Sequence, residues 1–219
     1  MDKKDVTYEY IEPEMKVVKE EALAEYNTKR KYTYDEVQFW ITPDHRRWEL
    51  IDGIPIAMAS PSPEHQLISA ELSFLFSNYL RGKNCQLIHP VDTVLSYEKG
   101  SDTYFIPDLI VLCDRNKIKS NGIFGAPDLV IEILSPATSS RDKVEKRHKY
   151  EEAGVKEYWI VDPRNKSIEV SLLQINEKFT SRTYKREDVV KVSIFRDLEI
   201  NIAAVFANPW LHINDEQKT

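Results

Sequence analysis

One apolar run interrupted by a single acid constrains this chain more than any other feature. Residues Leu129–Leu134 read LVIEIL, so apolar side chains would lie on both faces of a sheet, as in a strand covered on both sides. Glu132 is the exception, and burying a carboxylate without a partner is costly. The run therefore predicts a buried strand whose glutamate is paired, hydrogen-bonded or bound to a cation. The alternative is an edge strand whose glutamate points to water.

The segments around this run predict an α/β fold. A strand of similar apolar character is expected at Tyr104–Leu112, and it carries Asp108. A charged helix follows the first run over residues 140–153, and Tyr158–Val161 then reads as another strand. Because strand, helix and strand in this order form a β-α-β unit, we expect Leu129–Leu134 and Tyr158–Val161 to be parallel.

The rest of the chain carries start and stop signals for further elements. Asp52-Gly53 between two apolar runs predicts a hairpin with a tight turn, and Pro55 suggests an edge position for its second strand. Thr33 and Glu36 form a capping box for a short helix that bears Trp40. Further expected elements are a helix capped by Ser62 and ended by Gly82, strands at Gln86–His89 and Thr93–Tyr97, and a hairpin at Ile168–Leu173 and Phe179–Tyr184.

The composition is that of an ordinary globular protein. Of the 219 residues, 42% are hydrophobic and 30% are charged, and no apolar run approaches the roughly 20 residues of a membrane span. We expect a charged N-terminal extension at residues 1–32, one domain at 33–209 and a polar tail at 210–219. The N-terminus lacks the apolar core of a signal peptide, which predicts a cytoplasmic protein that does not contact a membrane.

The cysteines and the net charge narrow the classes of site. Cys85 and Cys113 form no CxxC pair, and this favours two reduced thiols over a zinc site or a disulfide. The formal net charge of −6 argues against tight binding of nucleic acid by the whole surface. It remains compatible with a local basic patch around an acidic, metal-filled centre.

The charged helix supplies a candidate catalytic cation. Asp142, Lys146 and Tyr150 recur every four residues and share one face. Most charges on this helix fit an exposed surface with weak ion pairs, but Lys146 should turn toward the strand of Glu132. Carboxylates hold magnesium, and a lysine beside them can offset negative charge in a transition state. Asp108, Glu132 and Lys146 are therefore the minimum set for phosphodiester hydrolysis.

Two further residues are candidates, each with an alternative. Glu49 lies in the first strand of the predicted hairpin, where it is either a further acid or an exposed residue. His65 lies in the first turn of the helix capped by Ser62. It could touch a phosphate or hydrogen-bond Glu49, or it could have only a capping or surface role.

Several short motifs between Thr33 and Phe206 are specific in combination. They are Trp48–Gly53, Pro61–His65, Pro107-Asp108, Ala126–Pro136, Asp142 with Lys146 and Tyr150, Gly154-Val155 and Glu157–Pro163. This combination resembles the Uma family of restriction-endonuclease-like proteins, within the PD-(D/E)XK nuclease superfamily.

The resemblance implies both a fold and a site. The fold would be α/β, with a restriction-endonuclease-like core in which a mixed, bent β-sheet is flanked by helices. The implied metal ligands are Asp108, Glu132 and the carbonyl of Ile133, with Glu49 as a supporting acid. The superfamily pattern places a lysine two residues after the second acid, where this chain has Leu134. Lys146, on the neighbouring helix, is the expected replacement.

The expected function is a magnesium-dependent endonuclease that hydrolyses DNA, with Mn²⁺ as an alternative cation. A homodimer is expected because cutting both strands usually needs two sites. The alternative is a non-catalytic protein that keeps this fold and acts through protein or nucleic-acid binding. The acidic pI and Leu134 favour the alternative, whereas the joint presence of Glu49, Asp108, Glu132 and Lys146 favours the enzyme.

Overall fold

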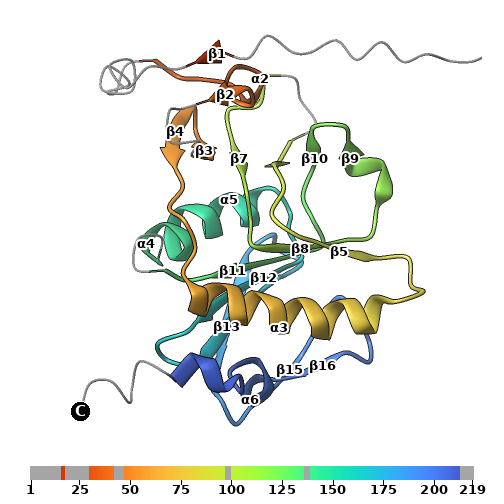
Figure 1. Ribbon diagram of the computed structural model, residues 1–219. Coiled ribbons are helices and arrows are strands. Elements are labelled where there is room, and N and C mark those ends of the chain that lie inside the picture. Colours follow the sequence, from red (N-terminus) through yellow and green to blue (C-terminus); the bar gives the residue numbers. More distant parts are fainter. Residues whose placement is uncertain (1–15, 18–29, 42–46, 97–99, 136–138, 213–219) are drawn as a thin grey trace, which may run out of the picture.

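The computed structural model describes residues 16–17, 30–41, 47–96, 100–135 and 139–212. Most of the predicted N-terminal extension and of the polar tail lies outside these ranges. Two six-stranded sheets dominate the described part, and helix α3 (Pro63–Leu80) crosses one of them (Figure 1). None of the described helices combines the length and the apolar character needed to cross a bilayer.

The sheet that contains Glu132 is mixed. Its strand order is β14 (Phe179–Tyr184), β13 (Ser167–Leu173), β12 (Glu157–Asp162), β11 (Leu129–Ile133), β8 (Leu109–Leu112) and β5 (Gln86–Ile88). Strands β11 and β12 are parallel, as the β-α-β pattern predicted, and the other pairs are antiparallel. Strand β11 lies inside the sheet with all five residues buried, so it is not an edge strand.

Both faces of this sheet are covered, which explains the nearly continuous apolar run in β11. Ile131 and Ile133 pack on the face covered by α3, where the rings of Phe76 and Trp159 meet edge to face. Val130 packs with Tyr150 on the opposite face. Glu132 follows the alternation of a strand and therefore shares this second face with Val130.

The second sheet is built around the predicted hairpin. Its order is β4 (Ile54–Ala57), β3 (Trp48–Ile51), β7 (Tyr104–Phe105), β6 (Thr93–Val94), β10 (Gly122–Phe124) and β9 (Ile118–Lys119). Asp52 and Gly53 have φ angles of 49° and 80°, as the two central residues of a type I′ turn require. Pro55 lies on the edge strand β4, as predicted.

The predicted single strand at Tyr104–Leu112 was wrong. The chain leaves one sheet after Phe105 and enters the other at Leu109. Pro107 lies in this crossing and cannot donate a ladder hydrogen bond, which suits a break between strands. The crossing places Asp108 at the junction of the two sheets. The strand expected at Thr93–Tyr97 is also shorter, because β6 ends at Val94.

The helices form where their start signals predicted them, but two of them differ from prediction in extent or type. The Ser62 hydroxyl accepts a hydrogen bond from the His65 N–H and caps α3. Trp40 lies in strand β2 (Trp40–Ile41) rather than in the helix predicted from Thr33, because that helix, α2 (Tyr34–Val37), ends at Val37. The charged helix is three consecutive segments, α4 (Ser139–Arg141), the π-helical η2 (Asp142–Lys146) and α5 (Arg147–Glu152), instead of one α-helix.

The remaining described elements are short. They are β1 (Lys16–Val17), η1 (Arg115–Lys117), β15 (Val189–Lys191), β16 (Glu199–Asn201), α6 (Ile202–Val205) and η3 (Pro209–His212).

The prediction of two reduced thiols was also wrong. Cys85 and Cys113 form a disulfide across 28 positions of sequence. The physical reason is the antiparallel register of β5 and β8, which pairs Gln86 with Leu112 and so brings Cys85, directly before β5, opposite Cys113, directly after β8. The separation of 28 positions between the two cysteines does not by itself indicate this pairing.

Candidate active site

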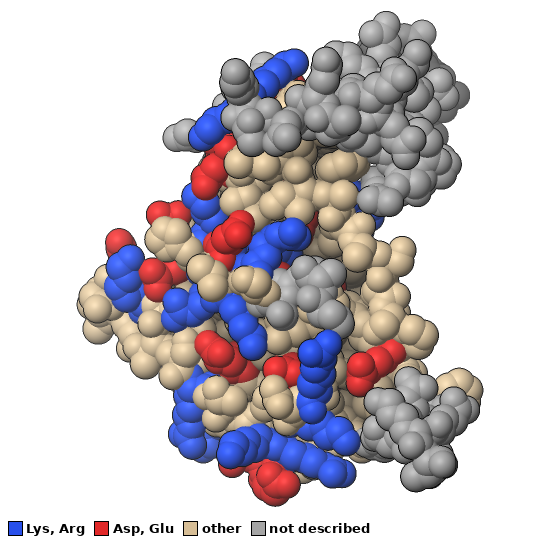
Figure 2. All heavy atoms as spheres, turned by 90° about the vertical axis from the view of Figure 1, so that its left-hand side faces the viewer, with Lys and Arg blue, Asp and Glu red and all other residues tan. Residues whose placement is uncertain are grey.

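The six predicted site residues line one cavity of about 410 Å³. It is bounded by β3, the start of α3, the crossing before β8, the end of β11, and the α4–η2 segment. These elements lie on the left of Figure 1, which is the side that faces the viewer in Figure 2. Figure 2 shows Lys and Arg side chains mixed with Asp and Glu on this side rather than a continuous basic surface. The six residues are Glu49, His65, Asp108, Glu132, Ile133 and Lys146.

Glu132 is a buried and partnered acid. Its side chain is only 5% exposed, and its Oε1 accepts hydrogen bonds from Lys146 Nζ and from the Tyr150 hydroxyl, each at 3.0 Å. Burial raises the pKa of Glu132 well above its ordinary value, and the Lys146 charge opposes this rise. The inference that this glutamate must be paired is confirmed, and the edge-strand alternative is wrong.

Lys146 is the cation at the centre of this cluster. Its Nζ lies 2.8 Å from Glu49 Oε1, 3.0 Å from Glu132 Oε1 and 3.5 Å from Asp142 Oδ1. Burial alone would lower the lysine pKa, but the three carboxylates reverse this and raise it, so the ammonium stays charged. Lys146 is therefore part of a buried charge network and not of an exposed helix surface.

The π-helical segment η2 runs from Asp142 to Lys146, so both of these charged residues belong to it. Single-turn π-helices inside α-helices are uncommon and occur frequently at functional sites. Here Asp142 and Lys146 are both buried on the same side, and Tyr150 follows them toward Glu132 one turn later. The predicted shared face of the three residues is confirmed.

Glu49 is a second buried acid in the network. Only 2% of its side chain is exposed, and besides pairing with Lys146 it accepts a hydrogen bond from the Ile106 N–H at 3.0 Å. The alternative of an exposed hairpin residue is therefore wrong. Because Ile106 lies in the crossing between the sheets, Glu49 also ties the hairpin to the segment that carries Asp108.

Asp108 is held from two directions. Its Oδ2 accepts a hydrogen bond from the Ile133 N–H at 2.7 Å and lies 3.0 Å from His65 Nε2. Of the alternatives for His65, the hydrogen bond to Glu49 was wrong, because the His65 ring contacts Asp108 instead. An ionised carboxylate only accepts, so His65 donates from Nε2. Its Nδ1 is buried and has no hydrogen-bond partner among the described residues.

Two arginines of the cavity were missed by sequence reasoning. Arg47 and Arg141 both line it. Arg47 pairs with Asp92 at 3.3 Å, and Arg141 lies directly before Asp142. Their only signal in the sequence is proximity to Glu49 and to Asp142, which many charged residues of this chain share.

The oxygen ligands in this cavity suit a small hard cation. Mg²⁺ takes one or two carboxylates and completes its shell with water. Asp108, directly before β8, and Glu132, in the neighbouring strand β11, line the same cavity. Ile133 lines it as well. The described residues contain no preassembled group of three His, Cys, Asp or Glu ligands. The residues present therefore fit a cation held by two carboxylates and water better than one enclosed by protein.

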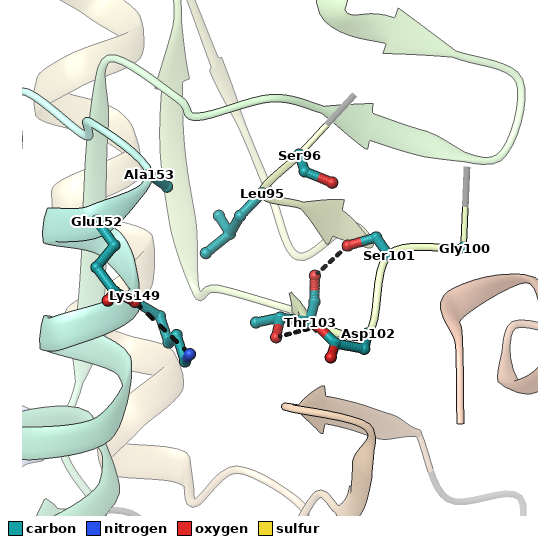
Figure 3. Close-up of a pocket in the computed structure, with 9 residues that line it drawn as sticks. All are labelled: Leu95, Ser96, Gly100, Ser101, Asp102, Thr103, Lys149, Glu152 and Ala153. Carbon is teal, nitrogen blue, oxygen red and sulfur yellow. Dashed lines mark hydrogen bonds and ion pairs between the residues drawn. The ribbon is translucent and has the colours of Figure 1, made fainter. Parts of the chain in front are cut away.

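A second cavity, of about 480 Å³, contains the neighbouring lysine of the same helix. Lys149 lines it together with Asp102, Thr103 and Glu152 (Figure 3). The Lys149 ammonium pairs with Asp52 at 2.6 Å and with Glu152 at 3.6 Å. None of the six predicted site residues lines this cavity. Lys146 and Lys149 thus line different cavities although they are only three positions apart in sequence.

Comparisons with known proteins agree with this architecture. Residues 33–203 match the model of a family described as "Putative restriction endonuclease" (Uma2). An uncharacterized protein of Synechocystis sp. is 31% identical over 148 residues, which are 67% of this chain and 76% of the relative. The crystal structure of a putative nuclease belonging to DUF820 from Anabaena variabilis superposes with a TM-score of 0.62 at 22% identity, covering 76% of this chain and 92% of that one. That likeness supports the restriction-endonuclease-like fold.

Proposed function

This chain belongs to the Uma2 family, whose description is "Putative restriction endonuclease", and from that premise we propose that it is a metal-dependent endonuclease that hydrolyses phosphodiester bonds of DNA. The observation that carries the proposal is the cavity shared by Asp108 and Glu132, in which the Lys146 ammonium lies 3.0 Å from Glu132. Two acids and a lysine in one cavity are the groups that this reaction needs.

Asp108 and Glu132 are the proposed ligands of Mg²⁺, with the Ile133 carbonyl as a third and Mn²⁺ as a substitute. When bound, such an ion lowers the pKa of a water molecule and neutralises charge on the attacked phosphate. His65 and the Ile133 N–H both hold Asp108 Oδ2, and this fixes the orientation of the carboxylate.

Lys146 is proposed to orient the attacking water and to offset negative charge in the transition state. An ammonium has three donors, and here three carboxylates surround it. The separation from Asp142 is the longest of the three at 3.5 Å, so this is the contact that a substrate oxygen would replace most easily. Glu49 keeps the ammonium in place while Glu132 serves the metal.

Cleavage of both DNA strands would need two such cavities. We therefore propose a homodimer as the active form, and sedimentation of the full chain with and without DNA measures it. A monomer that makes only single-strand nicks in plasmid DNA would exclude this part of the proposal.

The test of the function combines cleavage with metal binding. Wild-type protein should cut plasmid DNA with Mg²⁺ or Mn²⁺ and lose this activity in EDTA, whereas Asp108→Ala should lose both cleavage and the heat of metal binding in calorimetry. Lys143→Ala is the matched control, because Lys143 is exposed on the same helix. Cleavage that persists in Asp108→Ala would contradict the proposal.

A non-catalytic role is the second candidate, and one observation favours it. The Lys146 ammonium already pairs with Glu132, one of the two carboxylates proposed as metal ligands, while Leu134 stands where the superfamily has its lysine. A protein of this kind would bind neither Mg²⁺ nor Mn²⁺ in a way that depends on Asp108. Equal metal binding by wild type and Asp108→Ala, with no cleavage by either, would establish this second candidate.

A further inference from the structure

The acidic and the basic residues of the cavity differ in exposure. The carboxylates of Glu49, Glu132 and Asp142 are buried around one ammonium. Arg47 and Arg141 line the same cavity but are more exposed. The proposed metal would meet the reacting phosphate, but the next phosphate along the strand also carries negative charge near these acids, so it needs a cation that is not already engaged by the protein.

The cations of the cavity differ in their engagement. Lys146 is surrounded by three carboxylates, and Arg47 pairs with Asp92 at 3.3 Å. His65 is committed to Asp108. Arg141 is half-buried and, in the part of the chain that the structure describes, makes no ion pair or side-chain hydrogen bond. It is the cavity cation with donors to spare.

From this difference we propose that Arg141 is the residue that binds a DNA phosphate beside the reacting one and thereby sets the position of the strand in the cavity. This inference rests on the proposed nuclease function and adds a substrate-positioning residue to it. Arg141 follows Ser139–Ser140 in α4 and directly precedes η2. The same backbone segment that places Asp142 and Lys146 thus also places Arg141.

The chemistry of a guanidinium suits this role. It is planar, always charged, and presents parallel N–H donors that match two phosphate oxygens. A phosphate contact carries no base information, so Arg141 would increase affinity equally for all sequences. The mixed charges on this side of the molecule (Figure 2) make a single placed contact more important than it would be on a uniformly basic surface.

Arg147 on the next segment provides a matched control with the same side chain. Its guanidinium donates to the Ser181 hydroxyl at 3.1 Å and lies over the Phe179 ring. Arg147 does not line the cavity. A loss seen in Arg141→Ala but not in Arg147→Ala is therefore a property of the position and not of total charge.

The test measures DNA binding by the full chain over a range of salt concentrations, with Ca²⁺ in place of Mg²⁺ to separate binding from cleavage. Arg141→Ala should bind a DNA duplex roughly tenfold or more weakly, the scale of one charge-assisted hydrogen bond. The slope of log affinity against log salt should become shallower by about one, the value for one lost phosphate contact. Arg141→Lys should recover the slope but only part of the affinity, because an ammonium is not bidentate.

The kinetic and control readouts separate positioning from folding. In Mg²⁺, KM should rise about tenfold in Arg141→Ala while metal affinity and melting temperature stay at wild-type values. Equal salt slopes for wild type and Arg141→Ala would overturn the role of Arg141 and leave the nuclease proposal standing. Wild-type protein that neither binds nor cuts DNA would overturn both.

Discussion

The ammonium of Lys146 lies 3.0 Å from Oε1 of Glu132, although 14 positions separate the two residues in sequence. Glu132 lies in strand β11 and Lys146 in the π-helical segment η2, and the two elements meet on one face of the sheet that contains β11. Leu134, two residues after Glu132, is buried on that face and cannot supply a charge. The helix therefore provides at this site the cation that the strand lacks.

Replacing Glu132 with glutamine should remove metal binding without loss of stability. The glutamine amide oxygen can still accept from Lys146 or Tyr150, so the hydrogen bonds of this side chain are largely kept. Burial raises the pKa of Glu132 in the folded protein, so its charge costs stability at neutral pH. We expect Glu132→Gln to melt at the same temperature or a few degrees higher, a gain of about 0.5–2 kcal/mol.

The pH dependence of this effect has a defined sign. A raised folded-state pKa means that the wild type loses stability as pH rises from the ordinary glutamate pKa of 4.5 through the raised value. Glutamine does not titrate, so the stability advantage of Glu132→Gln should grow with pH in that window. Glu157→Gln is the matched control, because Glu157 is also buried and burial raises its pKa. Glu157 accepts a hydrogen bond from the Trp159 indole N–H and does not line the cavity, so this change should leave metal binding intact. A marked drop in melting temperature of metal-free Glu132→Gln would contradict this prediction.

Removing the His65 ring should weaken metal binding without removing a ligand. His65 Nε2 lies 3.0 Å from Asp108 Oδ2, and it restricts the rotation of this carboxylate. Loss of a partner that orients a ligand typically costs about 10–100-fold in metal affinity. We therefore expect His65→Ala to lower Mg²⁺ or Mn²⁺ affinity by that factor in calorimetry, and His65→Gln to restore part of it.

The control for this change is an exposed histidine. The side chain of His148 is 59% exposed and pairs with Glu152 on its own helix, so His148→Ala should bind metal like wild type. Metal affinity that is the same in His65→Ala and His148→Ala would show that Asp108 does not depend on His65 for its orientation.

Local patterns predicted the elements of the fold because their causes are local. Asp52-Gly53 has an intrinsic preference for the positive φ angles of a tight turn and adopts them here, and Ser62 caps α3 through an N–H three residues away. The continuous apolar run around Glu132 likewise required a buried partner, and Lys146 is such a partner. For the candidate site, the four-residue spacing placed Lys146 on one face with Asp142 and Tyr150, and the structure has Lys146 and Tyr150 both contacting Glu132.

The features that sequence did not predict depend on contacts between distant segments. The break at Pro107 is visible only when both sheets are present, since either half alone reads as part of a strand. The partner of His65 depends on how α3 packs against the crossing between the sheets. That packing places the His65 ring beside Asp108 and not beside Glu49. In the sequence, Arg141 does not differ from the other charged residues of its helix, and only the folded structure shows that it lines the cavity.

The disulfide gives a prediction that depends on redox conditions. Cys85 and Cys113 close a loop of 28 positions, and a cross-link of this kind typically contributes about 2–4 kcal/mol by restricting the unfolded chain. Cys113→Ser should therefore lower the melting temperature of the oxidised protein and make it insensitive to a reducing agent. The wild type should fall toward the variant when reduced. A wild type whose melting temperature does not respond to reduction would show that this bridge contributes nothing to stability.

Replacing Lys146 with alanine should separate catalysis from metal binding. The acids that would hold the metal remain, so metal affinity should stay at or above the wild-type value. Metal-dependent cleavage should fall roughly 100-fold or more, the scale of removing one transition-state stabiliser. Lys143→Ala and Lys149→Ala are the matched controls, because Lys143 is exposed and Lys149 lies in the other cavity. Both should cut DNA at nearly the wild-type rate.

The same change has a stability signature that tests the charge network directly. Without the ammonium, the buried carboxylates of Glu49, Glu132 and Asp142 lose their shared cation, and the pKa of Glu132, which the Lys146 charge holds down in the wild type, should rise further. Acids with raised folded-state pKa values favour the folded state at low pH, so Lys146→Ala should be destabilised most at neutral pH and should approach the wild type as pH falls toward 4.5. A deficit that stays constant between neutral and acidic pH would mean that Lys146 contributes packing rather than charge. Cleavage rates in Lys146→Ala equal to those in Lys143→Ala would remove it from the catalytic set.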